Sequence, residues 1–543
     1  MDILVIGGHY SALHQDTLHH EDDFRLSADG ILLNVPNLTA YVKNGLSFPP
    51  KTIDNRRLAT SKQPYQQIYW SGIHLYDLLS KNGYEVELLN CHDTTDHFRL
   101  QLYKKKPACV IISMTFLNVQ SAANIVADIR EYLPDTWIAV GGNHTDYSYR
   151  VLTRQDDPLY QRPEVCNDYF FTMEQPIKGI DAYIVDTHGE ETLLLAVDQV
   201  IRKGKFPQNL PNTIVKSPAT GEPWQINPLQ PEVYNINEFQ INWSKVPYNY
   251  LSSVVPFQTT YGCPFKCKFC NFSLTKVHKK SIDILIAELR ALAEHSYVQR
   301  VWFTDDNFFL TERKVIEFCE RFIAEDFPFS WASFIRASSI TPKSVEMLKK
   351  SGCSMLMLGL ESGSQTILDS MGKDDTVSHY KQAASLLIEY GIDVEMSFIV
   401  GYPGETADTV DESIEFINSL PTNAEQISYL YLFKYNLVPM SPAFEKEERQ
   451  RWQMDGYKGD WTHKTMRSDQ VGGHLKRFAA NTPNMVFNYL DPESKLARRD
   501  YVSLIRLRDD VARAKLSNGI NSADYKQAWN ILEEEVRRSL ITK

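Results

Sequence analysis

Short apolar runs alternate with amphipathic stretches over residues 1–225 of the chain. The amphipathic stretches place apolar residues three or four positions apart, as helices do. Because strands that alternate with helices form parallel sheets, this region predicts a doubly wound, Rossmann-like α/β domain. The predicted strands are Ile3–Gly7, Glu85–Leu89, Ala108–Ser113, Trp137–Val140 and Ala182–Val185, and the helices between them include Trp70–Lys81, Ser121–Tyr132 and Glu191–Lys203.

The alternation resumes over residues 226–445 with a different spacing. Helix boundaries are marked there by Ser281 as an N-cap, by Thr341-Pro342 at a helix start and by Gly352 at its end. Six strand–helix units in succession predict a partial (β/α)6 barrel of the TIM type, whose chemistry lies at the carboxyl ends of the strands. The predicted strands are Val254–Thr260, Arg300–Thr304, Trp331–Ile335, Met355–Leu360, Val394–Val400 and Ile427–Phe433.

Two further segments fit neither pattern. About residues 9–67 form an insertion in the first domain that a short βα connection does not need. We predict a solvated loop or lid there, with a metal site as the alternative because four histidines lie beside acidic residues. Residues 446–543 are charged and helical in pattern, and they predict a helical C-terminal domain. The four histidines are His9, His14, His19 and His20.

Composition narrows the class of protein. A length of 543 residues predicts about three or four domains. No run approaches the ~18 apolar residues of a membrane span, and the apolar start of the chain has no basic leader, so we expect no membrane segment and no signal peptide. The net charge of −11 argues against nucleic acid as the main partner. Eight cysteines, scattered outside one loop, do not suggest a disulfide framework and favour a cytoplasmic protein.

That one loop lies directly after the first barrel strand. Gly262 to Cys270 reads GCPFKCKFC, which places Cys263, Cys267 and Cys270 at C-x3-C-x2-C spacing. Three thiolates can hold three irons of a [4Fe–4S] cluster and leave the fourth iron open to a small molecule. A structural zinc site, the alternative, needs four ligands, and the next candidate, His278, lies at a spacing that fits no common zinc pattern. We therefore predict an iron–sulfur cluster.

Five lysines flank the cysteine loop. They can guide an acidic electron donor or a phosphorylated substrate, and a solvated surface is the alternative. These lysines are Lys266, Lys268, Lys276, Lys279 and Lys280.

The cysteine spacing, with Phe269 before the last cysteine, resembles the signature of the radical S-adenosylmethionine (SAM) enzymes. The acidic turn Asp305-Asp306 and the turn Gly401–Thr406 are similar to the D-D-x-F and G-x-P-G-E-T turns frequent in that family. In the first domain, Gly141–His144 resembles the G-G-x-H turn of relatives with a cobalamin-binding domain, and Gly189–Thr192 resembles a shortened form of their G-E-x-E-T segment. The chain is thus similar to the cobalamin-dependent, class B radical SAM methyltransferases over roughly residues 66–440.

The resemblance implies SAM contacts at the strand ends. The acidic pair would bind a cationic amine, Glu361 and Ser362 the ribose or the methionyl part, and Arg336 the carboxylate. Adenine would pack on Ile399 beside the glycine-rich turn, which lets the backbone approach a flat ring. Helix capping by the acids or by Ser362 and a surface ion pair for Arg336 are the alternatives. The predicted SAM contacts are Phe269, Asp305, Asp306, Arg336, Glu361, Ser362, Ile399 and Gly401.

The resemblance also implies cobalamin at the carboxyl edge of the first sheet. One feature departs from the methionine-synthase type, which carries D-x-H-x-x-G after the first strand, because Gly7–Ser11 reads GGHYS here. Relatives that lack this histidine still bind cobalamin, and others keep the domain as a scaffold without the corrinoid. The predicted cobalamin contacts are Ser113, Thr115, Gly141, Gly142, His144, Gly189 and Glu190.

The activity that the resemblance implies is methylation of an unactivated carbon of a small natural-product intermediate. A 5′-deoxyadenosyl radical, made by reductive cleavage of SAM at the cluster, would start the reaction, and cobalamin would supply the methyl group. We expect a monomer with a small-molecule substrate and a flavodoxin or ferredoxin-type electron donor, and no nucleic acid or membrane. The alternatives are a radical SAM cyclase or rearrangement enzyme, a tRNA methylthiotransferase and a non-catalytic corrinoid carrier.

Overall fold

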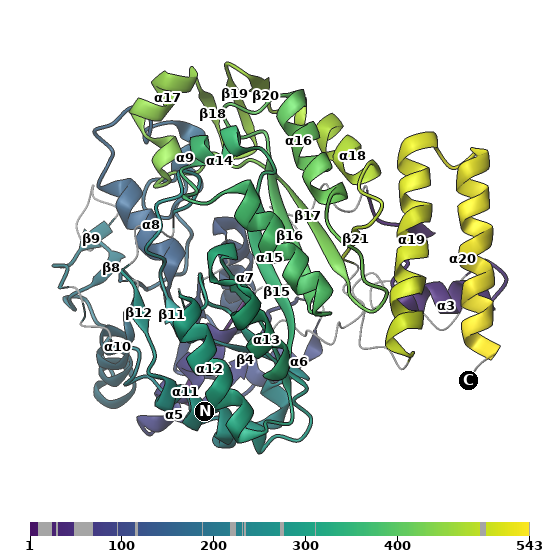
Figure 1. The fold of residues 1–543 in the computed structure, drawn as a ribbon. Helices are drawn as coiled ribbons and strands as arrows, with labels where there is room; N and C mark the ends of the chain where they lie inside the picture. The colour runs from purple at the N-terminus through teal and green to yellow at the C-terminus, as the bar shows by residue number, and fades with distance from the viewer. Residues whose placement is uncertain are drawn as a thin grey trace. The chain divides into compact units, whose positions relative to one another are not determined.

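The structure is a computed structural model in which the chain forms two compact units. The N-terminal unit comprises residues 1–17, 67–256 and 278–295, and the barrel unit comprises residues 18–66, 257–277 and 296–543. Each unit is built on a seven-stranded sheet with helices (Figure 1). The structure describes residues 1–8, 24–28, 31–47, 69–94, 96–114, 118–186, 188–217, 224–230, 232, 235–271, 276–309, 311–488 and 496–541.

The sheet of the N-terminal unit has the strand order β4-β1-β5-β6-β7-β8-β9. Its first five strands are parallel, which confirms the doubly wound prediction, and β8 and β9 add an antiparallel edge that the sequence pattern did not predict. The chain order reverses between β1 and β5, and sheets of this kind bind ligands at the carboxyl ends beside such a reversal. The strands are β1 (Ile3–Ile6), β4 (Val86–Leu89), β5 (Cys109–Ser113), β6 (Trp137–Gly141), β7 (Ala182–Ile184), β8 (Thr213–Lys216) and β9 (Trp224–Ile226).

Helix α5 (Trp70–Lys81) has the predicted bounds, and its start packs closely on the end of β1. A Cβ on Gly72 would lie 3.0 Å from the Cα of Gly7, and a Cβ on Gly8 would overlap the ring of Tyr69 at 2.1 Å. These glycines are therefore required by the packing of helix against strand. The other helices of this sheet are α6 (His97–Tyr103), α7 (Val119–Tyr132), α8 (Asn143–Leu152), α9 (Pro163–Cys166) and α10 (Glu190–Lys203).

A buried polar network joins α6 and α7 to the end of β4. The carboxylate of Asp128 accepts hydrogen bonds from His92 Nε2 and Tyr103 Oη, both at 2.9 Å, and from Arg99 Nη2 at 3.0 Å. Burial alone raises the pKa of Asp128, but these hydrogen bonds hold it well below the ordinary value of an aspartate. The carboxylate is therefore the shared acceptor of three buried donors.

We expect Asp128→Ala to destabilise the N-terminal unit by about 3–5 kcal/mol, because the buried Arg99 guanidinium then lacks its counter-charge. Urea unfolding at pH 7 measures the effect, and Asp198→Ala, a change at a half-exposed site on α10, is the matched control. A difference below about 1 kcal/mol between the two variants would contradict the network's role.

The sheet of the barrel unit has the order β10-β13-β14-β15-β16-β17-β21. All six predicted strands are present, and those from β13 onward pair in parallel. The seventh strand, β21 (Val486–Phe487), was not predicted and comes from the segment that the pattern assigned to helices. The other strands are β10 (Val254–Phe257), β13 (Arg300–Phe303), β14 (Ser330–Ile335), β15 (Cys353–Glu361), β16 (Asp393–Val400) and β17 (Ser428–Lys434).

The helix signals of this region act as predicted. Ser281 accepts from Ile284 N at 3.3 Å, Thr341 caps its helix through Ser344 N at 3.2 Å, and Gly352 has a φ of 76°. Rings of Phe303, Phe308, Phe318 and Trp331 pack within 5.8 Å of one another and fix α12 to the sheet. Of the helices in this part of the sequence, α11 (Ile282–Ala293) belongs to the N-terminal unit. The barrel unit contains α12 (Glu312–Glu325), α13 (Pro342–Lys350), α14 (Gln365–Met371), α15 (Val377–Glu389) and α16 (Ala407–Asn418).

The described part of the C-terminal segment is largely helical, as predicted, and besides β21 it contains a small antiparallel sheet. That sheet consists of β18 (Asp455–Tyr457), β19 (Asp460–His463) and β20 (Met466–Arg467). The strands are short and charged residues interrupt them, so the sequence pattern did not predict this sheet. Its buried residues are Tyr457, Trp461, His463 and Met466. The helices are α17 (Lys446–Trp452), α18 (Val471–Ala480), α19 (Arg498–Asn518) and α20 (Ala523–Ile541).

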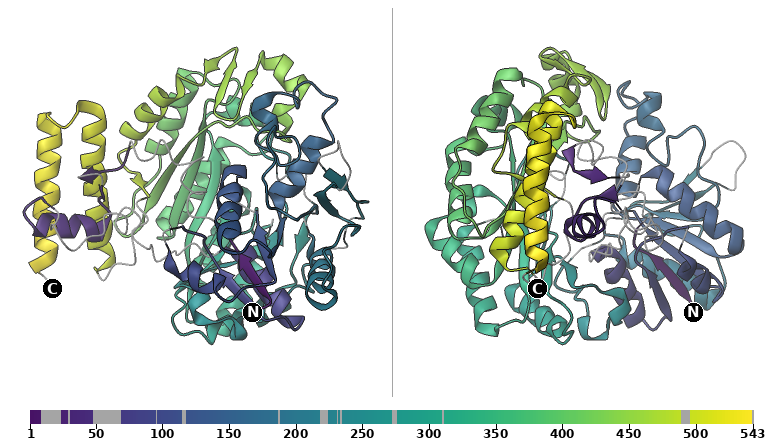
Figure 2. Two further views of the ribbon diagram at one scale, coloured as in Figure 1. Left: turned by 180° about the vertical axis from the view of Figure 1, so that it is seen from behind. Right: turned by 90° about the vertical axis from the view of Figure 1, so that its right-hand side faces the viewer.

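The described part of the predicted insertion belongs to the barrel unit. It forms the strands β2 (Ser27–Ala28) and β3 (Ile31–Leu32) and the helix α3 (Val35–Lys43), which lies beside the helical pair α19 and α20 (Figure 2). The rings of Tyr41 and Trp529 meet edge to face at 6.2 Å. The four histidines of the insertion lie outside the described residues. In the described ranges, no helix is both long and apolar enough to span a membrane.

Candidate active site

The cysteine loop follows β10 and the short strand β11 (Thr260–Tyr261) at the carboxyl end of the barrel sheet. Cys267 is buried, Cys263 and Cys270 are half-buried, and none of the three is in a disulfide. Gly262 opens the loop with a φ of 80°, and Cys270 N donates to Cys267 O at 3.1 Å. The loop therefore presents three thiols within eight residues at the end of the barrel where chemistry is expected.

The three donors of the loop are all thiols, the type of ligand that an iron–sulfur cluster needs. Cysteine thiolates are the usual protein ligands of such clusters. In the described part of the chain, no three His, Cys, Asp or Glu side chains are gathered as they would be around a single metal ion. Burial raises the pKa of the Cys263 thiol, and a bound metal would deprotonate it. Cys263, Cys267 and Cys270 are the residues that would hold the cluster.

Two adjacent carboxylates hold the segment that leads into the loop. Asp305 Oδ1 accepts from Thr259 N at 2.7 Å and Thr260 N at 2.9 Å, and its Oδ2 accepts from the Thr259 hydroxyl. Asp306 Oδ2 accepts from Gly262 N at 2.8 Å. Burial raises the pKa of Asp305 to about 6.

This arrangement separates the two interpretations of the acidic pair. The exposed-cap alternative is wrong, because Asp305 is buried and the N-cap position of α12 is Thr311. The predicted SAM contact stays a prediction. Since both oxygens of Asp305 are already engaged, we infer that it positions the loop, and Asp306 holds the residue directly before Cys263.

The other side of the loop is held by residues from far along the chain. Lys268 N donates to Met371 O at 2.8 Å, and Lys268 O accepts from Ala443 N at 2.8 Å. Its ammonium lies 2.7 Å from Glu448 of α17. The amide, the carbonyl and the ammonium group of Lys268 are thus all engaged. This lysine holds the cysteine loop in place and is not simply a solvated surface residue.

The remaining flanking lysines fall into two kinds. Lys280 is buried and ion-paired with Glu288 in the N-terminal unit. Lys266, Lys276 and Lys279 are exposed and stay available to a charged partner.

Arg336 follows β14 and contacts the loop through a ring. Its guanidinium lies 3.7 Å from the ring centre of Phe265, and Nη2 donates to Lys373 O at 2.7 Å and to Asp374 O at 3.0 Å. The ion pair that we gave as the alternative is present, since Nη2 lies 3.6 Å from Asp375 Oδ2, but it is not at the surface, because the Arg336 side chain is only 12% exposed. Its Nε has no hydrogen-bond partner among the described residues. The predicted contact of Arg336 with SAM stays a prediction.

The end of β15 carries backbone strain at a candidate contact. Glu361 has a φ of 67°, and the pairing with β16 shifts register beside it. Its Oε1 accepts from Lys373 Nζ at 2.9 Å, and a Cβ on Gly359 would meet that oxygen at 2.6 Å. Lys373 also lies 5.7 Å from the ring centre of Phe269. Strain at a strand end that faces a cofactor loop is typical of functional sites.

Lys373 is a residue that sequence reasoning missed. It follows α14 in a charged turn and looks like a surface lysine, yet it is buried between Glu361 and Phe269. Lys373 therefore connects two predicted SAM contacts, Glu361 at the end of β15 and Phe269 in the cysteine loop. Only a charge count along the turn Lys373–Asp375 could have singled it out, and that signal is weak.

Ser362 does not cap α14, which was the alternative that we gave, because the N-cap position is Ser364 and no side chain caps that helix. Ser362 instead holds the turn before the helix. Its Oγ accepts from Ser364 N at 3.1 Å and lies 3.3 Å from Ser413 Oγ. Gly363 N donates to the same Ser413 Oγ at 2.8 Å. These bonds hold the turn before α14, whose N-cap position is Ser364. The predicted contact of Ser362 with SAM stays a prediction.

The turn after β16 has glycines for a reason that differs from the predicted one. Gly401 has a φ of 96°, and a Cβ there would lie 2.6 Å from the indole of Trp461 on β19. His463 Nδ1 accepts from Met466 N at 3.2 Å, so its Nε2 carries the proton and donates to Gly401 O at 3.0 Å. The flat ring against Gly401 is thus the protein's own tryptophan. The predicted adenine contact falls on Ile399, which is half-buried and pairs with Phe433 across β16 and β17.

Glu405 closes the same turn by accepting from Gly401 N, and burial raises its pKa to about 8. The folded protein keeps this carboxyl protonated between pH 4.5 and 8 while the unfolded chain ionises it. Stability must therefore fall as pH rises through that window, by up to about 1.4 kcal/mol per pH unit.

We expect Glu405→Gln to flatten this dependence, because the amide oxygen can still accept from Gly401 N and carries no charge. Urea unfolding at pH 5.5, 7.0 and 8.5 measures the slope, and Glu346→Gln on the exposed face of α13 is the control. The variant should be more stable than the wild type at pH 8.5. An unchanged slope would contradict the buried, protonated state of Glu405.

The predicted cobalamin contacts lie at the carboxyl edge of the N-terminal sheet. Ser113 ends β5, with its Oγ 3.0 Å from Ser71 Oγ, and Gly141 ends β6. Gly142 has a φ of 106°, and the ring of His144 stacks on Tyr169 at 5.4 Å. A Cβ on Gly141 would make only ordinary contacts, 3.6 Å from Ile184, so packing in this unit does not demand that glycine. Small residues at this edge fit a large flat group.

The last predicted contacts follow β7. A Cβ on Gly189 would lie 2.4 Å from Ile184, so here the packing does require glycine. Glu190 Oε1 accepts from His74 Nε2 at 3.1 Å, and the His74 ring stacks on Trp70 at 4.7 Å. Burial alone raises the pKa of Glu190, but His74 lowers it below the ordinary value. Thr115 lies outside the described residues.

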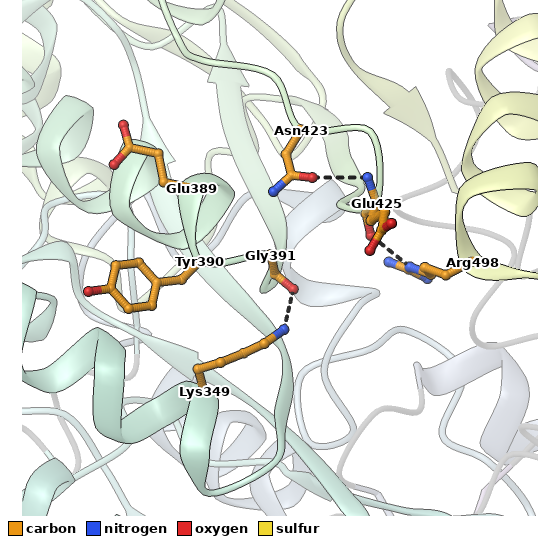
Figure 3. Close-up of a pocket in the computed structure, with 7 residues that line it drawn as sticks. All are labelled: Lys349, Glu389, Tyr390, Gly391, Asn423, Glu425 and Arg498. Atoms are coloured by element: carbon orange, nitrogen blue, oxygen red, sulfur yellow. Dashed lines mark hydrogen bonds between the residues drawn. The ribbon is translucent and has the colours of Figure 1, made fainter.

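A polar pocket of about 370 Å³ lies at the opposite, amino ends of β16 and β17 (Figure 3). Its cations hold backbone carbonyls, because Lys349 donates to Gly391 O at 2.8 Å and Arg498 Nε donates to Glu425 O at 2.9 Å. Residues at the amino ends of barrel strands usually contribute to stability, whereas catalytic residues lie at the carboxyl ends. We therefore do not assign this pocket to the active site. Its remaining lining residues are Glu389, Tyr390 and Asn423.

Comparison with known proteins agrees with this geometry. Residues 257–417 match the family model described as the radical SAM superfamily. An uncharacterized methyltransferase of Pyrococcus horikoshii is 30% identical over 333 residues, which cover 60% of this chain and 67% of that protein. The anaerobic magnesium-protoporphyrin IX monomethyl ester cyclase of Rubrivivax gelatinosus is 27% identical over 63% of this chain and spans 60% of the cyclase.

Among solved structures, the radical SAM methyltransferase TsrM of Kitasatospora setae, with cobalamin and a [4Fe–4S] cluster bound, superimposes with a TM-score of 0.59 at 14% identity. The match covers 88% of this chain and 97% of TsrM. The cobalamin-dependent SAM radical enzyme OxsB gives a TM-score of 0.57 at 14% identity over 86% of this chain and 72% of OxsB. At such identities the likeness establishes the fold. The fold and the cysteine loop define a radical SAM enzyme, and the chain belongs to the radical SAM superfamily.

Proposed function

We propose that the protein is a radical SAM enzyme that methylates an unactivated carbon of a small molecule with the help of cobalamin. The observation that carries the proposal is the cysteine loop, which presents three thiols at the carboxyl end of the barrel. Asp305, Asp306, Lys268 and Arg336 hold this loop in place. When bound, the cluster supplies the electron that cleaves SAM, and cobalamin supplies the methyl group.

The chain's own residues have positioning roles in this proposal. Cys263, Cys267 and Cys270 hold the cluster, and the braced loop fixes its distance from the ends of the neighbouring strands. Glu361, held by Lys373, offers a carboxylate oxygen to the SAM ribose, and Ile399 offers an apolar surface to adenine. Because these side chains are already held in place, ligand binding costs less conformational entropy.

Cobalamin would sit at the carboxyl edge of the N-terminal sheet, on the small residues at the ends of β5 and β6. Support comes from that edge, from the relatives named as methyltransferases, and from the shared fold with TsrM and OxsB. The substrate is a small molecule, a flavodoxin or ferredoxin-type protein supplies the electron, and we keep the predictions of a monomer and of a reducing, cytoplasmic location.

The test of the cobalamin half is anaerobic reconstitution with iron, sulfide and hydroxocobalamin, followed by gel filtration and absorbance of the protein peak. We expect about one corrinoid to stay bound per chain. With dithionite as the reductant, SAM should yield S-adenosylhomocysteine only when the corrinoid is present, whereas 5′-deoxyadenosine should need only the cluster. Protein that retains no corrinoid yet forms 5′-deoxyadenosine would remove cobalamin from the proposal and leave the radical half intact.

A second candidate is a radical SAM cyclase without methyl transfer. The similarity to the Rubrivivax gelatinosus cyclase favours it, since that match covers 63% of this chain. Product mass separates the two, because methylation adds one carbon and cyclisation adds none. A product without the added carbon would replace the methyltransferase by the cyclase.

A further inference from the structure

The barrel sheet has one face against its helices and an inner face that is turned away from them. The ring of Trp331 meets Phe318 of α12 at 5.3 Å. On β16, Phe398 meets Phe478 of α18 at 5.1 Å, and the residues on that side are buried, whereas the inner residues between them are half-buried. β17 alternates in the same way up to Phe433. Because the interior of a full TIM barrel is packed with side chains, half-buried inner residues mark a face that a ligand can reach.

Aromatic rings stand at both sides of this inner face. Phe334 of β14 pairs with Met357 of β15, which pairs with the inner residue Glu395 of β16, so the Phe334 ring lies on the inner face. That ring is 43% exposed. On β17, three strands away, the rings of Tyr431 and Phe433 stack at 6.1 Å with their planes 30° apart. An accessible apolar surface of this kind is typical of a binding site.

The centre of the inner face joins these rings to the proposed SAM contacts. Strands β15, β16 and β17 run side by side, and Ser397 pairs with Gly359 and with Tyr431 (Figure 1). The short side chain of Ser397 leaves a shallow floor there. Glu361 lies beside it, since a Cβ on Gly359 would meet its Oε1 at 2.6 Å, and Ile399 is the next inner residue along β16. The ring-lined face is therefore continuous with the candidate active site.

The width of the face limits the shape of its ligand. From β14 to β17 the sheet spans three strand spacings, about 14 Å. One ring cannot contact both Phe334 and Tyr431 across that width, whereas several fused rings can. Aromatic side chains contact flat rings by offset stacking or edge to face, and a puckered aliphatic ring offers no flat surface for either. These observations favour a flat, polycyclic ligand.

We propose that the substrate is a flat, apolar molecule of several fused rings, bound on the inner face between Phe334 and the stacked rings of Tyr431 and Phe433. The proposal rests on the proposed function, because it takes SAM to lie at the carboxyl end of the same sheet. It names the chemical class of the small molecule that the proposed function leaves open. The few polar groups of the face, among them Ser397, would orient the ring system.

The test compares three amines on the full-length, reconstituted protein. The first, 1-pyrenemethylamine, has four flat fused rings, benzylamine has one ring, and 1-adamantanemethylamine has a cage of puckered aliphatic rings. Each carries one ammonium group, which the carboxylate of Glu395 on this face does not repel, so differences in affinity report the ring system. Pyrene fluorescence gives the first dissociation constant, and displacement of that probe gives the other two.

We expect the wild type to bind 1-pyrenemethylamine at least about 10-fold more tightly than either other amine. Phe334→Ser should weaken this binding about 10-fold, the range for one lost stacking contact. Ser397→Phe, which fills the floor, should weaken it at least as much. Phe98→Ser removes an equally exposed ring, 40% accessible on α6 of the N-terminal unit, and should change nothing. Thermal unfolding checks that each variant is folded.

Three results would overturn the proposal. Equal affinity for the three amines, or an equal loss in Phe98→Ser and Phe334→Ser, means that the probe binds without regard to this face. Wild-type protein that forms 5′-deoxyadenosine from SAM but does not bind 1-pyrenemethylamine removes the flat substrate and leaves the proposed function intact. Protein that binds the probe and carries its four irons, yet forms no 5′-deoxyadenosine, overturns the proposed function and the substrate class with it.

Discussion

Replacing Cys267 by alanine should reduce the formation of 5′-deoxyadenosine by about three orders of magnitude or more, equivalent to ~4 kcal/mol of barrier. Cys267 is the buried member of the three thiols, and a cluster that loses one of three ligands no longer keeps a single open iron. Anaerobic reconstitution of the variant, with iron and sulfide counted against protein, should show well under the about four irons per chain expected for the wild type.

The matched control is Cys319→Ala. Cys319 is a fully buried cysteine on α12 whose sulfur lies 3.4 Å from Ser351 Oγ, among core residues of the same unit. This variant should lose some stability but keep the cluster and its activity. Equal iron content in Cys267→Ala and the wild type would contradict the assignment of the loop as the cluster site.

The second large effect is expected at Asp305. Asp305→Ala removes the acceptor for Thr259 N, Thr260 N and the Thr259 hydroxyl, all buried, and should cost about 3–5 kcal/mol of stability. Because this carboxylate holds the segment that leads to Cys263, cluster affinity should fall about 10- to 100-fold, as it does when supports of metal ligands are removed. Urea unfolding and iron content measure the two effects.

Asp305→Asn decides between bracing and direct contact with SAM. Its amide oxygen can still accept from Thr259 N and Thr260 N, so a brace should survive with nearly full iron content. Asp469→Ala, at an exposed site before α18, serves as the control for loss of a carboxylate. If Asp305→Asn keeps its iron but loses affinity for SAM, Asp305 contacts SAM directly and the inferred bracing role is wrong.

The repeating strands and helices were predictable because their pattern is local. The bounds of α5 agree residue for residue, and each of the six predicted barrel strands has a counterpart within a few residues. Capping by Ser281 and Thr341 needs only side chains near the helix start. By contrast, β21 has two residues and is defined by its pairing with β17, a contact between segments about sixty residues apart that no local pattern encodes.

The candidate site divides in the same way. The three cysteines are visible as spacing within one loop, and so are Asp305, Asp306 and Gly401 as turns at strand ends. What each side chain does depends on partners elsewhere in the chain. Glu448 reaches Lys268 across 180 positions, and Trp461 takes the space beside Gly401 that we had predicted for adenine. Lys373 looks like a surface lysine until the fold places it against Glu361.

The measurement that tests the central claim most directly is the yield of 5′-deoxyadenosine from SAM. The wild-type protein, reconstituted anaerobically with iron and sulfide and reduced with dithionite, should contain about four irons per chain and convert SAM to 5′-deoxyadenosine and methionine. The Cys267→Ala variant should form neither under the same conditions. The protein could instead carry four irons and bind SAM without forming 5′-deoxyadenosine. That result would contradict the radical SAM activity that we assign to this chain.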